Sequence, residues 1–137
     1  ATSEFSKIDE RFQNLKNIQN VFLNCFFNSP NTENLFIKLT SDEKIDFSRY
    51  KYFYASFVAN SGKIDEAKKI VKSAIKLYPR NLLLNQYKFD LDKNKNISVF
   101  DCKKEEHVIS EILYITANAL SSQSIYVLSN FYLNLAK

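Results

Sequence analysis

The chain has 137 residues, a length that fits one domain. One glycine and two prolines are too few for strands joined by tight turns, and a net charge of +4 is too small to indicate nucleic-acid binding. No apolar run approaches the ~18 residues that a membrane helix needs, so the composition argues against a membrane span and predicts an all-α protein.

The N-terminal third predicts three helices. The first covers residues 4 to about 27, where apolar residues recur every three or four positions and form one stripe. A short helix opens at Asn31 or Thr32 and ends near Leu39. A third helix is expected over residues 41–60, beginning at a serine that suits the N-cap position. The stripe of the first helix is expected to pack on the helices that follow, with a dimer seam or a docking face as alternatives.

The remaining chain predicts four more helices. The clearest covers residues 64–78, with acidic side chains in its first turn and a lysine near its end, as the helix dipole favours. The next helix covers residues 81–91. A longer one runs from about 104 to 120, and a turn at 121–124 leads into a last helix that carries apolar residues from 126 to the end.

A repeated pattern of small and large residues links two of these regions. Residues Ser48 to Asn81 have small residues where two antiparallel helices should touch, a large residue between hairpins, a turn glycine and a closing proline. The matching positions are Ala55, Gly62, Ala67, Val71, Ala74 and Pro79. This stretch resembles a tetratricopeptide repeat (TPR), although Lys51 stands where the pattern wants a bulky residue.

A second, shorter match to the same repeat starts near Ser110. Its positions are Ala117, Ser124 in place of the turn glycine, Ser129, Leu133 and Ala136. The resemblance implies antiparallel helical hairpins stacked as a short TPR-like superhelix of bacterial type, with a long N-terminal helix.

The expected organisation is a single helical domain over residues 1–137. Its parts would be degenerate N-terminal helices over 1–47, a repeat over 48–81, an irregular unit over 82–109 and a truncated repeat over 110–137. The absence of methionine and the unfinished second repeat predict a fragment of a longer chain.

In the repeat family the first helix of each hairpin lines a concave groove that binds a peptide or protein. The positions that the resemblance carries onto this chain are Arg49, Tyr52, Ser56, Asn60, Gln86, Asp90, Glu111, Tyr114, Asn118 and Ser122. The basic clamp that some family members use for a terminal carboxylate is not reproduced. An internal peptide segment or a folded partner is therefore the expected ligand.

Other chemistries find little support in the sequence. Six oxygen-bearing residues fall at the spacing of an EF-hand calcium loop: Asp90, Asp92, Asn94, Asn96, Ser98 and Asp101. However, Lys95 replaces the glycine that this loop needs, and Asp101 is shorter than the usual bidentate Glu, so no calcium site is expected. His107 is the only histidine and has no metal-ligand spacing around it.

A basic stripe lines the helix at 64–78 and continues just beyond it. Its members are Lys68, Lys72, Lys76 and Arg80, spaced by four. Such a stripe could meet phosphate, but it is more typical of the solvated outer face of a repeat helix. Cys25 and Cys102 are far apart in sequence and are expected to be free thiols.

These observations predict a protein-interaction scaffold or adaptor with no enzymatic activity and no cofactor or metal. The alternatives are an accessory domain of a larger enzyme, such as a transferase, and an oligomerisation module. The expected partner is a protein or peptide, and self-association is possible. A cytoplasmic location is favoured, with an exported one left open because an N-terminal signal could have been removed.

Overall fold

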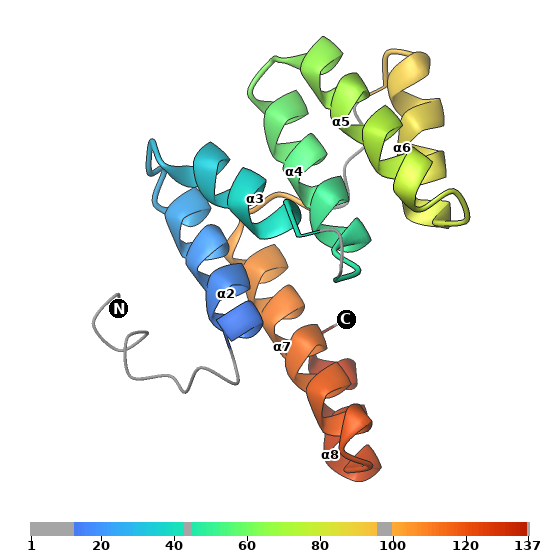
Figure 1. Cartoon of the computed structure of the whole chain (residues 1–137). Coiled ribbons are helices and arrows are strands. Elements are labelled where there is room, and N and C mark those ends of the chain that lie inside the picture. Colours follow the sequence, from blue (N-terminus) through green and yellow to red (C-terminus); the bar gives the residue numbers. More distant parts are fainter. Residues whose placement is uncertain (1–12, 43–44, 96–99, 137) are drawn as a thin grey trace. The chain divides into compact units, whose positions relative to one another are not determined.

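The computed structural model describes residues 13–42, 45–95 and 100–136, and within them every regular element is a helix (Figure 1). The helices are α2 (Gln13–Phe26), α3 (Thr32–Thr40), α4 (Ser48–Asn60), α5 (Ile64–Leu77), α6 (Leu82–Asp92), α7 (Glu105–Ser122) and α8 (Tyr126–Leu135). The predicted all-α fold is thus confirmed. The part of the first predicted helix that precedes residue 13 lies outside the described residues.

The chain forms two compact units. Unit 1 combines residues 1–28 with 102–137 and contains α2, α7 and α8; unit 2 is residues 29–101 and contains α3 to α6. The sequence predicts one domain in which the helices stack in chain order. In the structure, the first described helix instead groups with the last two, and the middle of the chain builds a core of its own.

Most predicted helices are found within a residue or two of their expected limits, but the helix expected from residue 41 begins later. The Ser41 hydroxyl donates to the Lys38 carbonyl at 2.9 Å, so this serine closes α3 rather than opening α4. The backbone N–H of Ser48 donates to Asp46 Oδ1 at 2.9 Å, where α4 starts. Asp46 thus satisfies a backbone N–H in the first turn of α4, and the helix begins about seven residues later than the sequence predicts.

Among the described residues, four turns use a residue in the left-handed region. These are Asn28 (φ 53°), Gly62 (φ 85°), Asn94 (φ 56°) and Ser124 (φ 63°). After α4, α6 and α7, the residue that follows this position donates its N–H to the carbonyl five residues earlier, which closes the helix end. Ser124 therefore occupies the position that the repeat pattern reserves for glycine, at a steric cost that glycine does not carry.

The core of unit 2 is centred on α4, which packs against α3, α5 and α6. The small residues that the repeat pattern singles out are buried at this centre, among them Ala55, Ala67 and Ala74, and Val71 is buried with them. The absence of bulk at these positions lets the helix axes approach closely. Aromatic rings fill the remaining space, as shown by Tyr52 and Tyr87, whose ring centroids lie 5.0 Å apart edge to face.

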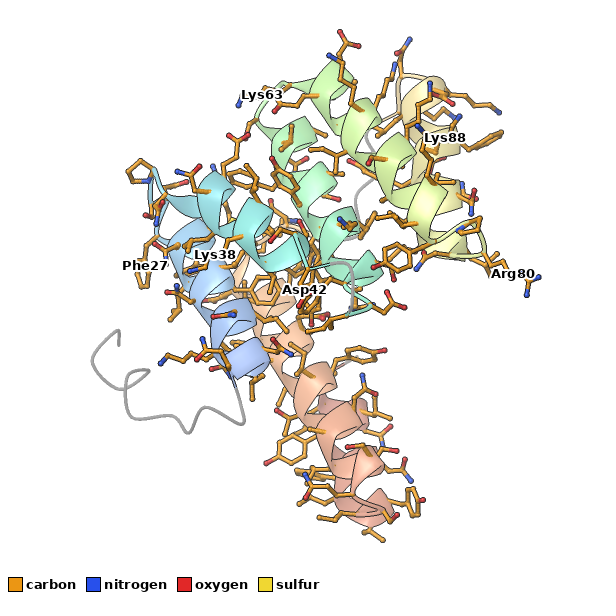
Figure 2. The ribbon with its side chains drawn as sticks, viewed as in Figure 1. Phe27, Lys38, Asp42, Lys63, Arg80 and Lys88 are labelled. Atoms are coloured by element: carbon orange, nitrogen blue, oxygen red, sulfur yellow. A yellow bond between two sulfur atoms is a disulfide. The ribbon has the colours of Figure 1, made fainter. Side chains whose placement is uncertain are left out.

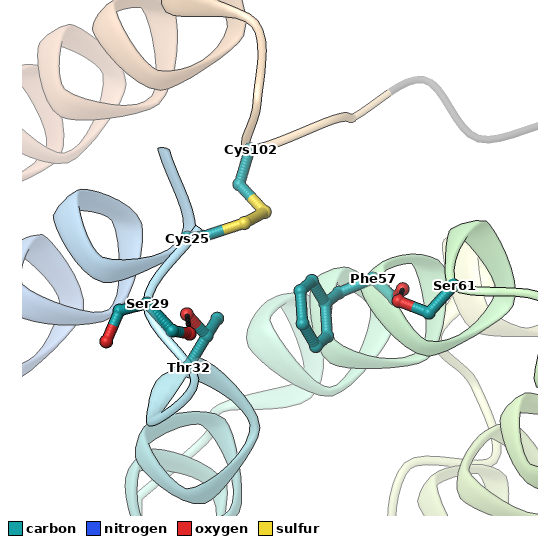
Figure 3. Close-up of a disulfide and its surroundings, with 6 residues drawn as sticks. All are labelled: Cys25, Ser29, Thr32, Phe57, Ser61 and Cys102. Carbon is teal, nitrogen blue, oxygen red and sulfur yellow. Dashed lines mark hydrogen bonds between the residues drawn. A yellow bond between two sulfur atoms is a disulfide. The ribbon is translucent and has the colours of Figure 1, made fainter. Parts of the chain in front are cut away.

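The expectation of free thiols is wrong, because Cys25 and Cys102 form a disulfide within unit 1 (Figure 3). Their Cα atoms lie 5.8 Å apart, a separation typical of a disulfide. The chain leaves unit 1 just after Cys25 and returns at Cys102, so the bridge ties together the two ends of the excursion that forms unit 2.

Candidate protein-interaction surfaces

The groove positions predicted on α4 are mostly not at the surface. Tyr52 is 2% exposed and Ser56 is fully buried, because α6 packs over them and the ring of Tyr87 lies nearly perpendicular to that of Tyr52. Burial raises the pKa of Tyr87 to about 12, as expected for a phenol removed from water. The prediction that Tyr52 and Ser56 line an open groove is therefore wrong, since the next helix covers them.

Another part of α4 is covered by Phe100, which lies between α6 and α7 in the chain. The Arg49 guanidinium lies 5.0 Å from the centre of the Phe53 ring, and Phe53 stacks on Phe100 with ring centres 3.9 Å apart. Phe100 is itself buried. Arg49 remains half-exposed beside this aromatic stack, and Asn60 is exposed at the far end of the helix.

The other predicted positions are divided between the two units. Gln86 is exposed on α6 and donates through Nε2 to Asp90 Oδ1 at 3.1 Å, a pairing within one helix turn. Glu111 is only 2% exposed, which contradicts its prediction as a groove residue. On α7, Tyr114 is half-buried, while Asn118 and Ser122 are exposed.

A groove between α5 and α6 gathers basic side chains from both helices. Val71 and Leu91, both buried, form its floor, and Lys68, Lys72, Lys88 and Asp92 form its rim. Its volume is about 270 Å³. Lys88 projects from α6 (Figure 2). The sequence identified the lysines of α5 as a stripe, but only the packing of α6 supplies Lys88 and the apolar floor.

Positive charge dominates the rim of this groove. Lys88 pairs with Asp92 one turn along α6, and the hydrogen bond from Lys88 holds the pKa of the Asp92 carboxyl below its usual range. Burial opposes this shift of the pKa with the next-largest effect, and the positive charges of Lys88 and Lys68 lower the pKa by smaller amounts. Lys72 has no hydrogen bond or ion pair among the described residues, so its ammonium is available to a ligand.

The rest of the basic stripe has a different environment. Arg80 lies at a second hollow of about 310 Å³, together with Asp46, Ser48, Tyr78, Pro79 and Asn81. There Asn81 caps α6 by accepting the N–H of Leu84 at 3.0 Å and donates to Ser48 Oγ at 2.9 Å. This hydrogen bond joins the starts of α4 and α6, which indicates a structural role for the hollow.

A second candidate surface lies on α8, which packs mainly against α7. Ser129 is buried at this contact and donates its hydroxyl to the Ala117 carbonyl at 2.8 Å, as the repeat pattern's pair of small residues suggests. The side of α8 that faces away from α7 exposes large apolar side chains beside Asn130 and Asn134. We call its apolar part the outer face of α8, and the residues are Val127, Leu128, Phe131 and Leu135.

The calcium-loop pattern does not form one loop in the described structure. Asp90 and Asp92 lie within α6 and already accept from Gln86 and Lys88, while Asn96 and Ser98 lie outside the described residues. No cluster of three His, Cys, Asp or Glu side chains suitable for a metal occurs among the residues that the structure describes.

The chain matches no protein-family model, no curated protein and no solved structure. Helices long and apolar enough to cross a bilayer are absent from the described ranges.

Proposed function

We propose that this chain is a non-catalytic protein-interaction adaptor, and that unit 2 binds an acidic peptide segment carrying apolar side chains in the groove between α5 and α6. The observation that carries the proposal is the combination of an apolar floor with three lysines from two helices. Apolar side chains of a ligand would lie against the lysine methylene chains above Val71 and Leu91, while its carboxylates would lie against the ammonium groups of the rim.

The arrangement of α4, α5 and α6 supports the interpretation of unit 2 as TPR-like. In such a repeat the first helix packs against its own partner and against the first helix of the next hairpin. α4 has both neighbours, α5 and α6. The binding surface differs from the one that the resemblance implies, because the predicted positions Tyr52 and Ser56 are buried beneath α6.

The size of the groove favours a peptide over a small metabolite. Pockets for small molecules and cofactors enclose about 300–1,000 Å³ and bury most of the ligand. A groove of about 270 Å³ bounded by flexible lysines is below that range. It has room for one or two side chains of a longer ligand, whose backbone would continue along the helices.

The proposal can be tested with a fluorescein-labelled peptide of alternating glutamate and leucine, whose binding is followed by fluorescence anisotropy. Charge reversal of Lys68 and Lys72 together should weaken binding about tenfold, since each exposed ion pair contributes up to ~1 kcal/mol. Added salt should weaken the wild-type complex as well.

The matched control reverses Lys38 and Lys69, which are exposed, lie outside the groove and change the net charge equally. It should bind the peptide within about twofold of wild type, because screened surface charges away from the ligand contribute little. Equal losses in both double variants would show attraction to net charge alone and would refute the groove, as would a wild-type protein that does not bind the peptide.

A further inference from the structure

The outer face of α8 is a different surface from the groove of unit 2. Its side chains are apolar, whereas lysines form most of the rim of the groove. Val127 is 88% exposed and Phe131 is 56% exposed, one turn apart on the same side of the helix. The opposite side of the helix packs against α7, where Ser129 is buried and hydrogen-bonds to the Ala117 carbonyl. The hairpin contact therefore fixes which residues of α8 face outward.

The part of the α7–α8 hairpin that follows Glu111 is unusual in this chain because it lacks charge. No charged residue occurs between Glu111 and Lys137, although a quarter of all residues are charged. A helix exposed to water normally carries charged or polar side chains on its outer side, and a helix that is apolar on all sides belongs in an interior. The outer face of α8 thus has the composition of a buried surface.

We infer that this face is the interface between two copies of the chain, paired about a two-fold axis through their α8 helices. A two-fold interface brings a surface against itself, so it must be free of unbalanced charge. The outer face of α8 meets that condition, whereas the lysine-rich rim of the unit 2 groove does not. A strongly charged partner, in contrast, would find no counter-charge on α8.

The spacing and the area of the face fit helix pairing. Leu128, Phe131 and Leu135 follow the three-then-four spacing of a helix–helix seam. Taking ~200 Å² for each large apolar side chain, the exposed fractions of the four residues amount to about 500 Å². Specific interfaces bury about 800 Å² per partner, so this face supplies over half of one, and side chains around it would complete the contact.

Sedimentation equilibrium of the full chain tests the inference. At about 100 μM, above the micromolar upper end of dissociation constants for interfaces of standard size, we expect twice the monomer mass of 16.0 kDa. Val127→Glu with Phe131→Glu should weaken the dimer at least about a hundredfold, because each carboxylate would be buried without a partner. The matched control, Leu82→Glu, adds charge at a residue that is 84% exposed on α6 and should leave the dimer intact.

A cross-linking measurement keeps the inference testable if the glutamate variant does not fold. Both native cysteines are in the disulfide, so Asn130→Cys, at an exposed site beside Phe131, introduces the sole free thiol and leaves the apolar residues in place. A short bismaleimide should join two copies through this position, and Leu82→Cys should give no covalent dimer. A monomeric wild type, or equal cross-linking at both positions, would overturn the inference.

Discussion

Reduction of the disulfide is expected to destabilise the protein substantially, and unit 1 more than unit 2. The bridge joins residues 77 apart in sequence. In the chain-entropy model, a closed loop of that length lowers the entropy of the unfolded chain enough to stabilise the fold by about 4.5 kcal/mol at 25 °C. Native disulfides typically contribute about 2–5 kcal/mol, so a loss near 4 kcal/mol is expected.

The loss should be unevenly distributed because of where the bridge lies. Its loop encloses the whole of unit 2, whose four helices pack around a core of their own. In unit 1, α2 is held to α7 by side-chain packing and by the bridge at Cys25. Hydrogen exchange of the reduced protein should therefore speed up in α2, while the amides of α4 keep most of their protection.

Urea unfolding followed by far-UV circular dichroism measures the effect. With a slope of about 2 kcal/mol/M, a loss of 4 kcal/mol lowers the midpoint by about 2 M. The control is Cys25→Ser with Cys102→Ser, which should match the reduced protein and not respond to reductant. An unchanged midpoint on reduction, or two reactive thiols in the untreated native protein, would refute the reasoning.

Three further results are expected. Ala67→Leu or Ala74→Leu should lower the free energy of unfolding by ~1–3 kcal/mol in urea titrations, since both alanines are buried where helices touch; a wild-type midpoint in both would contradict that packing. Ser124→Gly should raise the melting temperature by relieving about 1 kcal/mol at positive φ, and Gly62→Ala should lower it by a similar amount through φ alone, because nothing lies within 4 Å of an added methyl. Two shifts of the same sign would be incompatible with this account. Finally, the pKa of Tyr87 is about 12 in the fold against 10.0 in the unfolded chain, so the stabilisation from keeping this phenol protonated is complete below pH 10. The free energy of unfolding should fall by up to ~2–3 kcal/mol between about pH 10 and pH 12 as this stabilisation is lost. Tyr87→Phe should flatten that part of the stability–pH curve, and an unchanged slope would show that other groups cause it.

The sequence by itself determined the class of fold and most of its helices. Periodic apolar residues identified α5 to α8 within a residue or two, because each helix has one side that must leave water. The small residues Ala55, Ala67 and Ala74 predicted a contact between helices from the sequence alone, and all three are buried. Ser124 was correctly assigned to a turn because the repeat pattern wants a left-handed residue there.

Tertiary structure alone decided which helices pack together and which surfaces remain open. Helical periodicity identifies one buried side of a helix, but it does not reveal a second neighbour, so α6 covering Tyr52 could not be read from α4. Pairing of Cys25 with Cys102 required a contact between distant parts of the chain, which local patterns do not encode. Lys88 likewise joins Lys68 only after α6 packs beside α5, and this juxtaposition of side chains from separate helices creates the candidate site.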